Sequence, residues 1–144
     1  MPGQPSNFGK SALYTIYEYV LIVLPVALYI FLAAMADART PHSAGSSPEW
    51  NIATIFLVAQ AQSLYRLHIE ATGKRLSHPA LGLIASATLI VIVFAATNIQ
   101  ISLHMQTDRT VAAMWLLFGI ATSAFLGFVT GARLLSLRSR GGRE

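Results

Sequence analysis

The sequence predicts an all-α membrane protein, built as an antiparallel bundle of four transmembrane helices. Charged residues make up only 11% of the 144 residues, whereas a soluble domain usually carries about a quarter. Hydrophobic residues make up 54%, and they gather in four long stretches separated by short polar segments. Because those segments are too short to build a second core, we expect a single membrane domain over residues 1–144.

Each of the four apolar stretches reaches the roughly 20 residues that a helix needs to cross a bilayer. The first ends in Ala34-Met35-Ala36, which resembles a signal-peptidase site, but its apolar part is longer than a typical signal core. We therefore expect it to be retained as a span. The expected spans are approximately residues 11–36, 48–71, 79–103 and 110–137.

Polar residues at the ends of these stretches predict where the helices begin and end. Ser47 and Ser77 each precede a proline-containing first turn, so we expect both to cap helices. Gly73 is expected to end the second helix, because glycine accepts the backbone conformation that often follows a helix. The short connections between the spans make sequential helices antiparallel neighbours.

Lysine and arginine predict the orientation. If the N-terminus is cytoplasmic, eight basic residues lie on that side and only Arg39 and Arg109 lie on the other. Basic residues accumulate on the cytoplasmic side of membrane proteins. We therefore expect a multi-pass protein of the bacterial inner membrane with both termini in the cytoplasm, ending in a short basic tail over residues 138–144.

Glu18 is an ionisable residue about two helical turns inside the first span. Charges inside membranes are costly, so Glu18 either reaches water at the interface or has a buried partner. Arg66 of the second span is expected at a similar depth. The sequence therefore predicts a Glu18–Arg66 ion pair between helices, although Arg66 can also pair with Glu70 four residues later.

A polar stripe runs along the second span, where Gln62, Arg66 and Glu70 recur every four residues beside Ser63. Asn51 projects to nearly the same helical face. Such a stripe is unfavourable against lipid, so it forms either a sealed interhelical hydrogen-bond ladder or the polar lining of a channel shared between subunits. We favour the ladder. Asn98 of the third span also requires an interhelical partner or a wet cavity.

Small residues recur every four positions along the fourth span, at Gly119, Ser123, Gly127 and Gly131. Such a ridge allows another helix backbone to approach closely. It predicts packing within the chain or, alternatively, a self-association face. Large aromatic residues on other faces, including Phe125 and Phe128, would suit lipid or neighbouring subunits.

Four arginines at the C-terminal end suit anionic lipid headgroups or an acidic partner, or they simply anchor the last span. They are Arg133, Arg138, Arg140 and Arg143.

The sequence carries no signature of enzyme chemistry. Cysteine is absent, and no phosphate-binding loop, zinc-protease motif or nucleophile elbow occurs. None of the four histidines lies in the middle of a span, which argues against haem. We expect no catalytic residue, no metal and no cofactor. The net charge of +4 fits cytoplasmic loops of a membrane protein better than nucleic-acid binding.

These features predict a small homo-oligomeric protein that forms or gates a pore, or perturbs the membrane. In size and organisation the chain resembles the small four-helix membrane effectors of bacterial phage-defence and abortive-infection systems, which implies an effector role. A first alternative is a non-conducting anchor that recruits a cytoplasmic partner or ligand. A second alternative is a small proton-coupled exporter that uses Glu18. The expected partners are the lipid bilayer and further copies of the chain.

Overall fold

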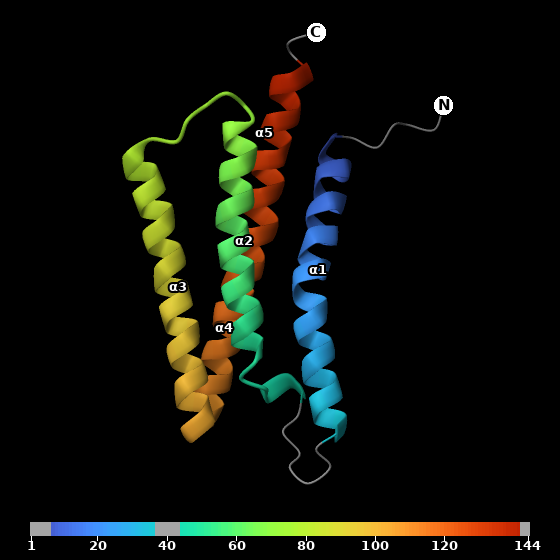
Figure 1. Ribbon diagram of the computed structural model, residues 1–144. Helices are drawn as coiled ribbons and strands as arrows, with labels where there is room; N and C mark the ends of the chain where they lie inside the picture. The colour runs from blue at the N-terminus through green and yellow to red at the C-terminus, as the bar shows by residue number, and fades with distance from the viewer. Residues whose placement is uncertain (1–6, 37–43, 142–144) are drawn as a thin grey trace, which may run out of the picture.

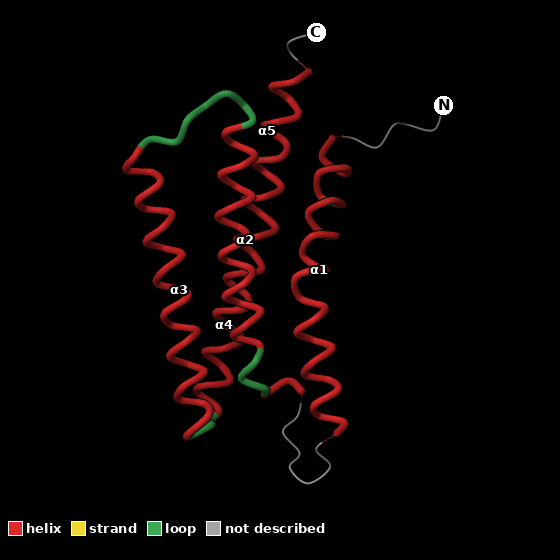
Figure 2. Tube along the Cα trace, in the orientation of Figure 1, coloured by secondary structure: helices red, strands yellow, loops and turns green. Residues whose placement is uncertain are grey.

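A computed structural model describes residues 7–36 and 44–141, and within them the chain is helical and contains no strand. Figure 1 shows long helices lying side by side, joined by the short loops that appear green in Figure 2. The helical fold class predicted from the sequence is confirmed. The elements are α1 (Asn7–Ala36), a short 3-10 turn η1 (Ala44–Ser46), α2 (Trp50–Glu70), α3 (His78–His104), α4 (Asp108–Ala124), a π-helical segment η2 (Phe125–Val129) and α5 (Thr130–Gly141).

The helix α2 lies at the centre of the arrangement and contacts α1, α3, α4, η2 and α5. The helices α1 and α3 flank it on opposite sides (Figure 1). The elements α4, η2 and α5 follow one another as a continuous helical rod that packs along α2. The start of α1 and the end of α5 lie at the same end of the molecule, called here the termini end.

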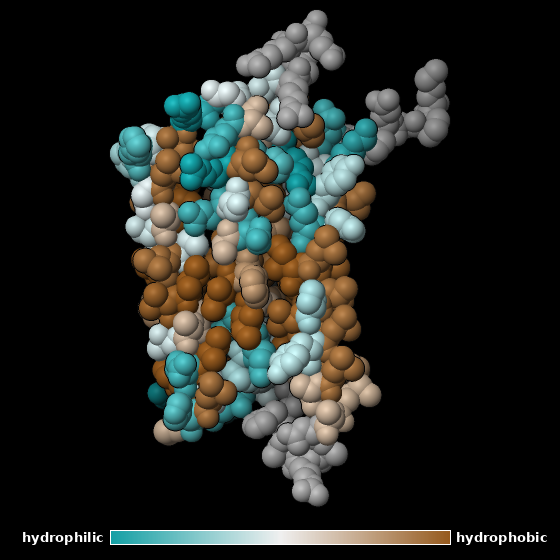
Figure 3. Space-filling view, in the orientation of Figure 1, coloured by the Kyte–Doolittle hydropathy of each residue, from teal (hydrophilic) through white to brown (hydrophobic). Residues whose placement is uncertain are grey.

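Among the described residues, three helices are long and apolar enough to cross a membrane, namely Asn7–Ala36, His78–His104 and Asp108–Ser139. The exception among the four long helical segments is α2, because polar residues interrupt its apolar sequence. Figure 3 shows an apolar band across the middle of the molecule, with hydrophilic residues gathered toward both ends. The polar character of α2 therefore distinguishes it from the helices that surround it.

The core lies between α2 and the rod. Leu57 from α2 and Ala121, Phe125 and Val129 from the rod are all fully buried. The π-helical segment adds a residue to one turn, and the rod turns the face containing Phe125 and Val129 toward α2. The expectation that Phe125 faces lipid is therefore wrong, whereas Phe128 is 63% exposed.

The helix ends follow the predicted pattern in part. Gly73 has a positive φ of 80° just after α2 ends, as expected of a helix stop. The Ser77 side chain accepts a hydrogen bond from the Ala80 N–H and so caps α3. The expected Ser47 cap is wrong, because α2 begins at Trp50 and the Ser47 hydroxyl instead donates to the Glu49 carboxylate.

Candidate functional site

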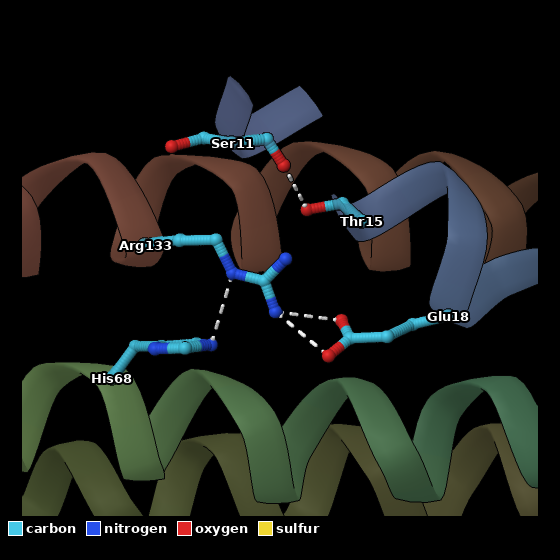
Figure 4. Close-up of polar contacts among 5 residues, drawn as sticks. All are labelled: Ser11, Thr15, Glu18, His68 and Arg133. Carbon is cyan, nitrogen blue, oxygen red and sulfur yellow. Dashed lines mark hydrogen bonds and ion pairs between the residues drawn. The ribbon is translucent and has the colours of Figure 1, made fainter. Parts of the chain in front are cut away.

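An ion pair joins the first and last helices near the termini end. The Arg133 Nη2 of α5 donates to both carboxylate oxygens of Glu18 of α1, at 2.7 and 2.8 Å. The side chains are only 12% and 31% exposed, respectively. In Figure 4 they point toward one another from the two helices. Because this pair is largely removed from solvent, either charge without the other would be strongly unfavourable.

Arg133 is also contacted by α2 and by a second residue of α1. Its Nε donates to the His68 Nε2 at 3.4 Å, and its guanidinium carbon lies 5.7 Å from the centre of the Tyr14 ring, within cation–π range. In this arrangement the His68 Nε2 acts as an acceptor, which requires that nitrogen to be unprotonated. A single side chain therefore links α1, α2 and α5.

The predicted pairing of Glu18 with Arg66 is wrong. Arg66 instead pairs with Glu70 along α2 at 2.8 Å, and both side chains are exposed, at 59% and 47%. Residues two positions apart on an α-helix point in nearly opposite directions. For this reason His68, and not Arg66, faces the ion pair, and Arg66 turns away from it.

Arg133 was expected in the group of arginines that bind lipid or a partner, and that assignment is also wrong. The last helix continues to Gly141, so Arg133 lies about 12 Å before its end at the helical rise per residue. Arg138 is exposed as expected. Arg143 and the side chain of Arg140 lie outside the described residues.

Two buried polar atoms beside the ion pair have no hydrogen-bond partner among the described residues, namely the Arg133 Nη1 and the Ser11 Oγ. Ser11 is fully buried on α1, and its carbonyl oxygen accepts a hydrogen bond from the Thr15 hydroxyl at 2.9 Å. Figure 4 shows Ser11 and Thr15 on the side of the guanidinium away from His68. The site therefore contains a donor and a hydroxyl that its present contacts do not use.

The polar stripe of α2 is not sealed within the chain. Ser63, Arg66 and Glu70 are exposed, and so is Gln60, which the predicted stripe did not include. Gln60 lies ten positions before Glu70, which corresponds to about 15 Å along the helix. The exposed polar face therefore extends from the termini end to the middle of α2. Gln62, four positions before Arg66, lies at the edge of this face and is half-buried.

Asn51 does not belong to this exposed face, contrary to the prediction. It is fully buried on α2, and its Oδ1 accepts a hydrogen bond from the Asn98 Nδ2 of α3 at 3.5 Å. The same Asn98 nitrogen donates to the Thr110 carbonyl of α4 at 3.0 Å. The two asparagines therefore form the sealed interhelical contact that was expected of the whole stripe, at the end of the molecule opposite the termini end.

We predict that Asn98→Leu lowers the free energy of unfolding by about 1 kcal/mol, because interhelical hydrogen bonds in membrane proteins contribute up to roughly 1.7 kcal/mol. The measurement is a detergent-denaturation titration of the purified protein. The control is Gln100→Leu, since Gln100 is exposed on the same helix. Equal losses in the two variants would contradict this role of Asn98.

The ridge of small residues faces outward from the rod. Gly119, Ser123 and Gly127 are exposed and Gly131 is half-buried. No heavy atom would lie within 4 Å of a Cβ built on any of these three glycines, apart from the local helix backbone. The expected close packing within the chain is therefore wrong, because the rod packs on α2 through the opposite face that contains Ala121 and Phe125. The self-association alternative remains a prediction.

Within the part of the chain that the structure describes, no group of three histidine, aspartate or glutamate side chains could hold a metal ion. Comparisons with protein-family models, with curated proteins and with solved structures find no match to this chain. The functional assignment therefore depends on the geometry of the exposed polar face of α2 and of the outward-facing ridge of small residues.

Proposed function

We propose that the chain is a four-span membrane protein that assembles with copies of itself to form or gate a pore. In this arrangement α2 is the fourth span, and both termini lie in the cytoplasm of a bacterial cell. The distribution of lysine and arginine supports that orientation. The membrane is the inner membrane, and the size and organisation of the chain support an effector role in phage defence.

The observation that carries the proposal is the exposed polar face of α2. Three long apolar helices support a location in a bilayer, and α2 lies among them with Gln60, Ser63 and Arg66 exposed. Lipid cannot satisfy the hydrogen bonds of these side chains, so water or another protein must cover them. Because the face reaches the middle of α2, we place a water-filled path beside it.

The interior of one chain does not supply that path. Leu57, Phe125 and Val129 fill the space between α2 and the rod and are fully buried. A water-filled path must therefore lie between copies. The outward-facing ridge from Gly119 to Gly127 supports this assembly, since small residues allow helices of neighbouring copies to approach closely.

The test is ion flux through vesicles that contain the purified protein at high density. We predict that Ser63→Leu reduces the flux about tenfold or more, because an apolar side chain in the lining promotes dewetting of a pore. The matched control is Ala85→Leu. Ala85 is exposed and lies seven positions from the termini end of α3, and Ser63 lies seven positions from the termini end of α2. No flux from the wild-type protein, or equal loss in both variants, would contradict the proposal.

The anchor alternative is supported by exposed basic residues at the termini end, namely Lys74, Arg75 and Arg138. An acidic cytoplasmic partner would be attracted to them. Under this alternative the wild-type protein does not conduct, and a partner co-purifies with it until these three residues are replaced by glutamine.

A further inference from the structure

A groove of about 370 Å³ lies between α2, α3 and the rod. Helix α3 leans away from α5 toward the termini end, as Figure 1 shows, and the groove is lined by the facing sides of these helices. Its walls are mostly apolar, with residues such as Val58, Leu83 and Val91. The volume is within the range of about 300–1,000 Å³ that is typical of small-molecule sites.

Three uncharged polar side chains also line the groove: Gln62 and Tyr65 from α2, and Thr88 from α3. None of the three makes a side-chain hydrogen bond to any other described residue. Gln62 and Thr88 lie about 12 and 15 Å from the termini ends of their helices at the usual rise. At that depth in an apolar environment an unpaired amide or hydroxyl is costly, so the groove favours an occupant that pairs with these groups.

The chemistry of the lining restricts that occupant. No charged side chain lines the groove, so a charged ligand would lack a counter-ion and would have to be desolvated without compensation. The Gln62 amide, the Tyr65 hydroxyl and the Thr88 hydroxyl can all donate hydrogen bonds. Each of these groups can also accept a hydrogen bond, but an uncharged carbonyl oxygen is an acceptor that can pair with all three. A lipid acyl chain would fill the apolar part but would leave all three donors unpaired.

The aromatic wall favours a flat occupant. The rings of Tyr65 and Phe128 meet edge to face, with their centres 5.9 Å apart. Phe128 belongs to the π-helical segment η2, and such segments occur frequently at functional sites. The edges and faces of these two rings, which form one wall of the groove, can pack well against a third ring.

We propose that this groove binds a lipid-soluble carbonyl compound, a flat ring with carbonyl oxygens and an apolar tail. The carbonyl oxygens accept hydrogen bonds from Gln62, Tyr65 and Thr88, and the ring packs against Phe128. This site does not depend on the proposed pore, because its α2 lining centres on Val58, Ala61 and Tyr65, on the side of the helix away from Ser63.

The test uses 4-hexylbenzophenone, a carbonyl-bearing photoreactive probe, on the full-length protein in lipid vesicles, with the labelled residues mapped by mass spectrometry. We expect saturable labelling within residues 58–65 and 83–91. Decyl-1,4-benzoquinone should compete for it, whereas decylbenzene, which has no carbonyl, should not. Gln62→Leu combined with Thr88→Val should weaken the apparent affinity about tenfold or more, from the loss of two hydrogen bonds.

Tyr65→Phe removes only a hydroxyl, and Thr88→Val replaces a hydroxyl with a methyl group. These single variants should therefore keep the fold even if the double variant does not. Each should weaken saturable labelling on its own. Ser86→Ala, at an exposed site two positions from Thr88, should leave labelling unchanged. Three results would overturn the proposal. Labelling does not saturate, decylbenzene displaces the probe as well as the quinone does, or a second copy fills the groove and excludes the probe.

Discussion

Replacing Arg133 with methionine is expected to lower the free energy of unfolding by about 2 to 3 kcal/mol. The change keeps an unbranched side chain, shorter than that of arginine, and leaves the Glu18 carboxylate without its partner. Breaking a fully buried ion pair costs roughly 3–5 kcal/mol, and the partial exposure of Glu18, at 31%, reduces that cost. The variant also loses the contacts of the guanidinium with His68 and Tyr14. The measurement is denaturant unfolding in mixed micelles.

Two further variants separate the ion pair from general damage. Arg66→Met removes an exposed pair on α2, so its cost should stay below about 1 kcal/mol. In a double-mutant cycle, Glu18→Met together with Arg133→Met should be less destabilising than the sum of the single variants, because neither charge is then left unpaired. Additive losses, or equal costs for Arg66→Met and Arg133→Met, would contradict a stabilising Glu18–Arg133 pair.

The existence of the four long helical segments could be predicted from composition and periodicity because each segment is long and bounded by clear signals. Gly73 and Ser77 mark ends that the structure also shows. These signals are local, so they require no knowledge of packing. The sequence predicted α2 as a fourth span of the same kind, whereas only three of the described helices are apolar enough to cross a membrane.

The partners of the charged residues could not be predicted in the same way, because they depend on how each helix is rotated about its axis. If α2 were rotated about its axis by the angle between two successive residues, a neighbour of Arg66 would point where Arg66 points now. Arg133 was grouped with the C-terminal arginines because a cluster of basic residues near a C-terminus is common. That Arg133 faces Glu18 of α1 becomes visible only when the helices are packed.

The packing face of the rod could not be predicted from the sequence either. Its small residues occur on more than one face, and sequence spacing assigned the packing face to the ridge of Gly119 and Gly127. The structure packs the rod through Ala121 and Phe125 instead. The π-helical segment begins at Phe125 and ends at Val129, and it changes the rotation of the residues that follow. Nothing in the spacing of the residues indicates that segment.

The central claim is that water covers the exposed polar face of α2 in the assembled protein. The chain contains no cysteine, so a single introduced cysteine reports its own surroundings. Modification by a charged, membrane-impermeant thiol reagent requires the thiolate, which forms readily only where water is present. Ser63→Cys and Ala85→Cys place the thiol at matched depths on α2 and α3.

The decisive measurement is the rate at which this reagent modifies the two variants in intact membranes. We predict that Ser63→Cys reacts about tenfold faster or more, because its thiol faces water whereas that of Ala85→Cys faces lipid. If Ser63→Cys reacted no faster than Ala85→Cys in the assembled protein, protein or lipid would seal the face. The account of a water-filled path beside α2 would then be wrong.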